Sequence, residues 1–168
     1  MIATVCHRSL VATQRPSLII VAGLPGSGKT TLATQLAIDR PGIRLCPDDW
    51  LAACGMTVWS SDLRARIERL QYELALDLLR CGTTPIIEWG TWTASEREQL
   101  RQAAHDMDAL AELIILDPPF ETLWARISER RREDPPITRE LLTEWDALFQ
   151  RPDEREASNF DTYSAIAE

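Results

Sequence analysis

The chain has 168 residues, an apolar fraction of 45% and a formal net charge of −8 at pH 7. This length predicts a single domain that can bury an ordinary core, and no apolar run approaches the ~20 residues that a membrane span requires. The acidic balance argues against general affinity for nucleic-acid backbones, although a nucleic-acid end bound in a local basic cleft stays open as a substrate.

Residues 1–16 precede the first strand pattern and contain no acidic residue. We expect them to form an N-terminal tail, with a transit peptide as the alternative, and we expect residues 17–168 to form the domain. The four cysteines have neither metal-ligand nor C-x-x-C spacing: Cys6, Cys46, Cys54 and Cys81. This spacing favours reduced thiols in a cytoplasmic protein.

A strand pattern and a helix pattern flank a glycine-rich segment. Residues 17–22 form an apolar, β-branched run that predicts a buried strand. Residues 23–30 are Gly-Leu-Pro-Gly-Ser-Gly-Lys-Thr, and residues 31–38 repeat apolar side chains at helical spacing. This order of strand, G-x-x-x-x-G-K-S/T and helix is the P-loop, which binds the phosphates of a nucleotide together with Mg²⁺.

The P-loop supplies the predicted ATP site. Gly26 and Gly28 allow backbone angles that bring amide groups close to phosphate, and the following helix adds its positive partial charge. Lys29 is the only lysine beside seventeen arginines, and its compact ammonium group is predicted to act in catalysis by contacting the β- and γ-phosphates. Thr30 is predicted to offer its hydroxyl oxygen to Mg²⁺. The predicted ATP-binding residues are Gly23, Leu24, Pro25, Gly26, Ser27, Gly28, Lys29, Thr30 and Thr31.

Strand and helix patterns alternate along the rest of the chain through residue 149. We predict strands at residues 43–46, 84–88 and 111–117, and helices at residues 62–80, 93–107, 120–131 and 138–149. This alternation predicts an α/β fold of the P-loop NTPase (kinase-like) class, three-layer α/β/α with a mostly parallel sheet. In such sheets the ligand lies beyond the carboxyl ends of the strands, so the residues that follow each strand are the candidates for a site.

Acidic side chains end three of the four predicted strands. Asp48 follows the second strand and is the candidate general base, because a kinase needs a carboxylate that orients and deprotonates the attacking hydroxyl. Asp49 is a second candidate, and a turn or a helix cap is the alternative role for both. Glu88 ends the third strand and is predicted to bind Mg²⁺ together with Thr30, with capping of nearby amides as the alternative. Asp117 ends the fourth strand.

Four arginines precede a Pro-Pro segment in the last third of the chain: Arg126, Arg130, Arg131 and Arg132. Arg126 and Arg130 are four residues apart and share a helix face. On a lid around residues 126–138, they are predicted to act in catalysis by stabilising charge on a transferring phosphoryl group. A solvated basic face paired with Glu129 and Glu133 is the alternative.

Tryptophans also follow strand ends: Trp50, Trp89 and Trp92. Packing in the core is the default interpretation of these side chains, and stacking on a planar or sugar-like acceptor is the functional one. The other three, Trp59, Trp124 and Trp145, are expected to pack in the core or at an interface.

The chain resembles the small P-loop kinase-like ATP-binding proteins that are often labelled AAA-family ATPases, which are relatives of chloramphenicol phosphotransferase, zeta toxin and polynucleotide kinase. The segments that carry the resemblance are residues 23–31, 47–50, 86–92, 96–97, 116–121, 126–131 and 149–152. The resemblance implies a P-loop kinase fold, MgATP as donor, a hydroxyl acceptor, Asp48 as base and lid arginines from Arg126 onward. Glu88 replaces the aspartate that is usual at its position. No segment resembles the second domain or the hexamer elements of ring ATPases.

These patterns predict a kinase that moves the γ-phosphate of MgATP to a hydroxyl group of a small molecule or nucleotide-type acceptor. The alternatives are a polynucleotide-end kinase and an ATP-dependent switch that acts through a protein partner. The acidic charge makes nucleic acid the less favoured acceptor. The sequence identifies neither the acceptor nor the oligomeric state.

Overall fold

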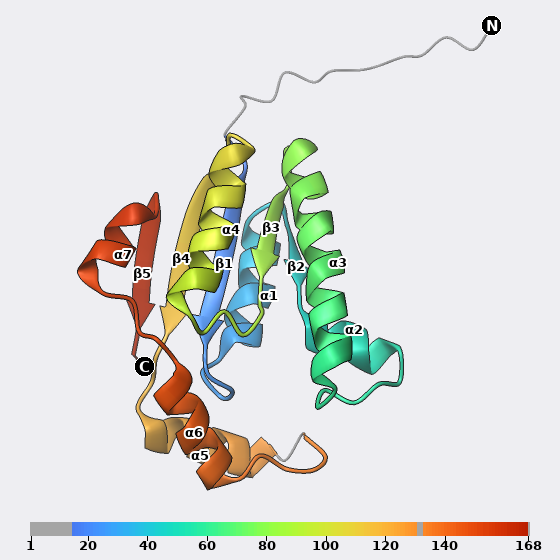
Figure 1. Ribbon diagram of the computed structural model, residues 1–168, viewed down its shortest axis with the longest axis vertical. Helices are drawn as coiled ribbons and strands as arrows, with labels where there is room; N and C mark the ends of the chain where they lie inside the picture. The colour runs from blue at the N-terminus through green and yellow to red at the C-terminus, as the bar shows by residue number, and fades with distance from the viewer. Residues whose placement is uncertain (1–14, 131–132, 168) are drawn as a thin grey trace, which may run out of the picture.

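The computed structural model describes residues 15–130 and 133–167. At its centre lies a five-stranded parallel sheet in the order β2-β3-β1-β4-β5 (Figure 1). The strands are β1 (Ser17–Gly23), β2 (Gly42–Leu45), β3 (Thr84–Ile87), β4 (Leu110–Leu116) and β5 (Thr162–Ile166). The helices are α1 (Lys29–Asp39), α2 (Pro47–Ala53), α3 (Ser61–Arg80), α4 (Ala94–Asp106), α5 (Phe120–Arg130), α6 (Arg139–Leu148) and α7 (Glu154–Asn159). This architecture confirms the predicted three-layer α/β fold.

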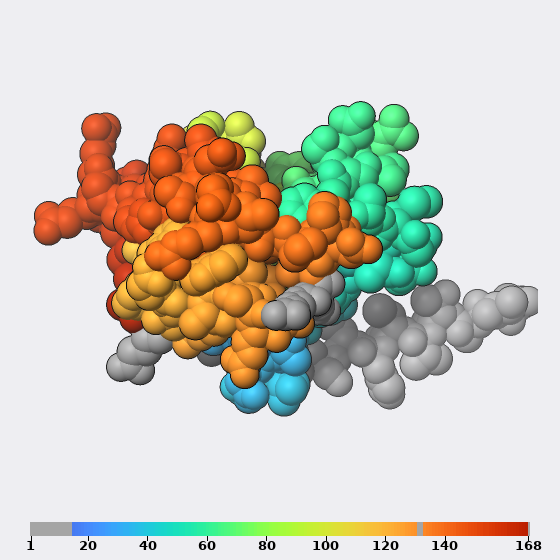
Figure 2. Space-filling view, turned by 90° about the horizontal axis from the view of Figure 1, so that it is seen from below, coloured from blue at the N-terminus to red at the C-terminus, as the bar shows by residue number. Residues whose placement is uncertain are grey.

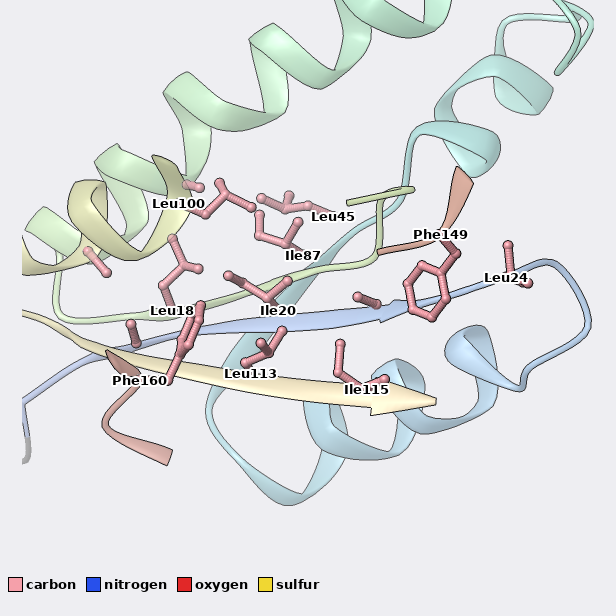
Figure 3. Close-up of a cluster of buried hydrophobic side chains, with 14 of the residues drawn as sticks. Leu18, Ile20, Leu24, Leu45, Ile87, Leu100, Leu113, Ile115, Phe149 and Phe160 are labelled. Carbon is pink, nitrogen blue, oxygen red and sulfur yellow. The ribbon is translucent and has the colours of Figure 1, made fainter. Parts of the chain in front are cut away.

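The central strand β1 is buried on both faces. Leu18 and Ile20 belong to the core beneath α3 and α4, whereas Ile19 and Val21 pack with residues of α1. Figure 1 shows α3 and α4 in front of the sheet and α1 behind it, and Figure 3 shows Leu18 and Ile20 gathered with Leu100 of α4. A parallel strand covered on both faces is continuously apolar, which is why residues 17–22 carry so clear a signal.

The sequence patterns do not predict α2, α7 or β5. Pro47 opens α2, and Asp48 and Asp49 occupy its first turn, where a fixed proline φ and acidic side chains favour a helix. β5 is a largely exposed edge strand with little apolar alternation, and it pairs with β4 from Glu112 opposite Thr162 onward. β5 therefore depends on backbone hydrogen bonds to β4, and the local sequence does not reveal this pairing.

The predicted N-terminal tail falls mostly on residues 1–14, which lie outside the described residues. Its last two residues extend the domain instead. An Arg15 nitrogen donates to the Asp108 carboxylate at 2.5 Å, and the Pro16 carbonyl accepts from the Leu110 N–H at 2.8 Å. Arg131 and Arg132 of the predicted lid also lie outside the described residues.

Cys46, Cys54 and Cys81 are free thiols, and Cys46 is the buried one of the three. Within the described ranges, no helix combines the length and the apolar character that a bilayer span requires.

Arg97 of α4 has a fully buried side chain whose five N–H donors all meet acceptors. The guanidinium forms a two-bond ion pair with Glu156 at 2.6 and 2.9 Å. It also donates to the carbonyls of Thr91 and Trp92, both at 3.1 Å, and to that of Gln150 at 2.7 Å. Arg97 therefore ties the loop after β3 to the segment that leads into α7.

We expect Arg97→Met to lower the free energy of unfolding by about 3–5 kcal/mol, because it leaves Glu156 and three carbonyls unpaired in the interior. Urea unfolding followed by circular dichroism measures this change. The matched control is Arg80→Met: Arg80 is exposed and pairs with Asp77 at the surface, so its loss should cost below ~1 kcal/mol. Equal costs for the two variants would contradict the structural role of Arg97.

Candidate active site

The P-loop joins β1 to α1 at the carboxyl edge of the sheet, and its glycines occupy positions that side chains would disturb. A Cβ on Gly23 would lie 2.4 Å from the Leu116 carbonyl oxygen of β4. Gly28 caps α1 with a φ of 100°, a conformation that other L-residues rarely adopt. A Cβ on Gly28 would meet no atom within 4 Å, so the backbone here faces open space that a ligand can approach.

Ser27 carries a polar group that the protein leaves unpaired. Its side chain is 3% exposed, and its hydroxyl has no hydrogen-bond partner among the described residues. The Ser27 N–H donates to the Leu24 carbonyl at 3.2 Å and closes the loop. A buried hydroxyl without a partner is costly, so Ser27 is a polar position that the closed loop leaves unsatisfied.

Lys29 lies in the loop with its ammonium group directed back at the backbone, since Nζ donates to the Leu24 carbonyl at 2.9 Å. Burial lowers the pKa of Lys29 to about 8, although the carboxylates of Glu88 and Asp48 act in the opposite direction. The Arg130 cation adds to the lowering. A bound polyphosphate would supply the negative charge that favours the protonated amine.

Thr30 and Glu88 are in direct contact. The Thr30 hydroxyl donates to Glu88 Oε1 at 2.5 Å, which joins the first turn of α1 to the residue that follows β3. Glu88 is 6% exposed, and its second carboxylate oxygen accepts from Arg44. The described residues contain no group of three or more potential metal ligands. Mg²⁺ usually takes one or two protein oxygens and completes its shell with water and phosphate, and this pair fits that pattern.

Asp48 and Asp49 lie side by side in the first turn of α2 but contact different arginines. Arg44 of β2 donates to Asp49 as well as to Glu88, and Arg64 of α3 donates to Asp48. The three acids at this edge are thus held by two arginines. Since Arg44 and Arg64 lie on different elements, they also fix the orientation of α2 relative to the sheet.

The sequence patterns did not single out Arg44 and Arg64, the two arginines that pair with the three acids at this edge. Arg44 interrupts an otherwise apolar strand pattern at residues 43–46, and that interruption was an available signal. Arg64 is one of several arginines on the long helix α3, and its spacing does not distinguish it from the others.

Helix α5 lies beside the P-loop. Arg126 donates to the Gly26 carbonyl at 3.4 Å, and a Cβ on Gly26 would lie 3.0 Å from the Leu123 carbonyl oxygen. Arg130 donates to Glu133 at 2.5 Å. This ion pair is the one expected if the arginines form a solvated basic face rather than a catalytic lid. Figure 2 views the carboxyl edge, with α5 and α6 in orange on one side and the segment of α2 in teal on the other.

Two further side chains that follow strand ends, those of Asp117 and Trp92, contact segments that come later or earlier in the chain. Asp117 accepts two bonds from Arg151, at 2.7 and 2.9 Å, and this pair ties the end of β4 to the segment after α6. The Trp92 indole donates to the Gly23 carbonyl at 3.4 Å, and its ring centroid lies 5.7 Å from that of Trp145. Trp92 therefore packs under the P-loop, as the core interpretation expects.

A family model described as AAA domain matches residues 18–152. The chain belongs to this family. The matched range runs from β1 through the P-loop, α2, β3 and α5 to the segment after α6. It confirms the resemblance to small P-loop kinase-like proteins.

Solved structures share the fold at low sequence identity. A chain of the Pnkp1/Rnl/Hen1 RNA repair complex is 21% identical with a TM-score of 0.70, over 88% of this chain and 47% of that chain. Kti12 from Chaetomium thermophilum, solved with ADP-AlF3, is 21% identical with a TM-score of 0.67, over 89% and 88%. The APS kinase CysC from Mycobacterium tuberculosis, solved with AMPPNP and APS, is 21% identical with a TM-score of 0.61, over 90% and 89%.

These identities establish the fold alone. The chain spans about half the length of the RNA-repair chain that it matches. A comparison with curated proteins found no match.

We expect Cys46, which lies between β2 and α2, to resist alkylation at pH 8. Burial raises the pKa of its thiol to about 11, and the charge of Glu88 acts in the same direction, so ~0.1% is thiolate at that pH. Timed reaction with iodoacetamide and peptide mass spectrometry should show Cys54 and Cys81, which are exposed, modified first. In urea the three cysteines should react at similar rates, because unfolding exposes Cys46. Similar rates in the native protein would contradict the buried position of Cys46.

Proposed function

We propose that the chain is an ATP-dependent phosphotransferase that moves the γ-phosphate of MgATP to a hydroxyl group of a small molecule. The observation that carries the proposal is the contact between Thr30 and Glu88 beside Lys29, with Asp48 close enough for its charge to act on the same ammonium group. A phosphate-binding cation, two oxygen ligands and a carboxylate therefore meet at one edge of the sheet. These are the groups that phosphoryl transfer requires.

The nucleotide site is formed by residues 23–31. The open backbone at Gly28 and the N-terminus of α1 that it caps support binding of phosphate oxygens there. Lys29 would leave the Leu24 carbonyl to contact the β- and γ-phosphates. Its ammonium group then gains a further negative partner that offsets the cost of its burial.

Thr30 and Glu88 would hold Mg²⁺, each through one oxygen. For this to happen the hydrogen bond between them must give way to the ion, so that the Thr30 oxygen becomes a ligand rather than a donor. Arg44 keeps Glu88 in position through its second oxygen. Bound Mg²⁺ neutralises charge that develops on the phosphate oxygens.

Asp48 would act as the general base. Bound MgATP supplies the γ-phosphoryl group: the acceptor oxygen bonds to the γ-phosphorus while the bond to the ADP oxygen breaks. Asp48 accepts the proton of the acceptor hydroxyl, and Arg64, which now pairs with Asp48, orients the carboxylate. Arg126 and Arg130 on α5 would stabilise the transferring charge from the opposite side.

The test measures ADP release from MgATP with pooled hydroxyl acceptors: sugars, nucleosides, amino sugars and oligonucleotides with free 5′-hydroxyl groups. We expect a small-molecule pool to stimulate release in the wild type. Lys29→Ala should lose this stimulation by about 10³-fold or more. Stimulation by oligonucleotides alone would show that the acceptor is a nucleic-acid end rather than a small molecule. Unchanged turnover in Lys29→Ala would refute the site.

Two neighbouring variants test the base. Asp48→Asn should lower kcat by ~10²–10⁴-fold while ATP affinity stays the same, because only proton acceptance is lost. Asp49→Asn is the matched control and should lower kcat by about tenfold or less, since Asp49 acts through Arg44. A larger loss in Asp49→Asn would assign the base to Asp49.

We also expect Glu88→Gln to raise the Mg²⁺ concentration for half-maximal activity by about 10-fold or more, because an amide oxygen binds the ion more weakly than a carboxylate. The control is Glu112→Gln, since Glu112 is likewise a buried acid paired with an arginine, Arg40. A magnesium titration of ADP release compares them. The same magnesium requirement in both variants would mean that Glu88 serves only as a cap.

A further inference from the structure

A cavity of about 630 Å³ lies between α3 and α4, beside the residues that follow Glu88. This size is typical of pockets that enclose a small organic ligand, ~300–1,000 Å³. Its wall includes two aromatic side chains, a threonine and three acids: Tyr72, Trp89, Thr91, Glu68, Glu96 and Asp106. None of these side chains is used by the nucleotide site, so the cavity needs an explanation of its own.

Trp89 and Thr91 give the cavity fixed recognition groups. The Trp89 indole N–H donates to the side-chain oxygen of Gln71 at 2.7 Å, which holds the ring in one orientation. Thr91 is 5% exposed, has a φ of 38°, and carries a buried hydroxyl with no hydrogen-bond partner among the described residues. Thr91 is thus a polar residue of the cavity wall whose hydroxyl the described part of the chain leaves unpaired.

The charges on the wall favour a cation. Glu68, Glu96 and Asp106 are opposed within the wall by Arg69 alone. Burial raises the pKa of Glu68, and its contact with Arg64 offsets this only in part. A ligand with an ammonium group would pair with these carboxylates, and aromatic ring faces such as that of Trp89 also attract cations.

The cavity is connected to the proposed base. Arg64 contacts Asp48 and also lies 3.5 Å from Glu68 on the cavity wall. Trp89, Gly90 and Thr91 of the same wall follow Glu88 in the chain. The cavity wall is therefore linked to Asp48 through Arg64 and to Glu88 through the three residues that follow it in the chain.

We propose that this cavity binds an organic cation that carries hydroxyl groups on a ring, and that this class of compound is the phosphate acceptor. The acceptor assignment rests on the proposed phosphotransferase function, whereas the binding of the cation does not. Because binding can hold without transfer, the two parts are measured separately.

The binding test uses isothermal titration calorimetry with the full chain. The probe is neamine, which has two hydroxylated six-membered rings and several ammonium groups, and the neutral comparator is maltose, which has two such rings and none. We expect neamine to bind at least about 10-fold more tightly than maltose, because each charged hydrogen bond to a carboxylate contributes appreciably. Equal or absent binding of the two probes overturns the proposal.

Variants assign the binding to the cavity. Glu68→Gln should weaken neamine binding by about 10-fold, and Thr91→Val should weaken it severalfold while the folded protein stays as stable as the wild type, because its unpaired hydroxyl is removed. The control is Asp77→Asn, an exposed acid on the same helix, which should leave neamine binding unchanged. Equal effects of Asp77→Asn and Glu68→Gln would show attraction to the acidic surface in general and would overturn the site.

The acceptor assignment has its own readout, transfer of ³²P from labelled ATP to neamine. Transfer that falls in Thr91→Val while AMPPNP binding is unchanged supports it. Cavity-dependent binding without transfer overturns the acceptor assignment and leaves the cation site standing. Transfer to a different compound together with no neamine binding overturns the cavity proposal and leaves the phosphotransferase function standing.

Discussion

The carboxyl edge of the sheet depends on the buried guanidinium of Arg97. A buried charge is stable only where each of its donors is paired, and here the pairing recruits carbonyls of the loop after β3 and the carboxylate of Glu156. Gln150 reinforces the same loop, since it donates its N–H to the Trp92 carbonyl and accepts from the Ala94 N–H, both at 2.9 Å. The loop that leads from Glu88 into α4 is thereby fixed, and Glu88 keeps its place opposite Thr30.

The charge balance at this edge explains how a site for a highly charged ligand can persist in the free protein. Arg44 pairs with Glu88 and Asp49, and Arg64 pairs with Asp48. The Arg64–Asp48 pair is the more exposed and contributes little to stability, whereas the Arg44–Glu88 pair is largely buried and holds Glu88 in place. The Arg64–Asp48 pair can therefore exchange for contacts with a ligand at small cost, while Arg44 offsets the repulsion between the carboxylates of Glu88 and Asp49.

The predictable part of the molecule is the part whose signals are local. Residues 17–22 and the P-loop could be predicted because burial on both faces and phosphate binding each impose a residue pattern within a few positions. β5 could not, because its pairing depends on β4, fifty residues earlier in the chain. The same holds for Arg64 and Arg97: their helices follow from periodicity, but their partners lie on other elements and depend on tertiary packing.

The fold is shared by a chain of an RNA repair complex and by an APS kinase, so the sheet and the P-loop do not choose the acceptor. Selection must come from surfaces that face the carboxyl edge without forming the nucleotide site. The wall between α3 and α4 is such a surface: it carries three carboxylates and Trp89, which follows Glu88 in the chain. An anionic molecule would be repelled by the excess of carboxylates on this wall, whereas a cation would be attracted to them.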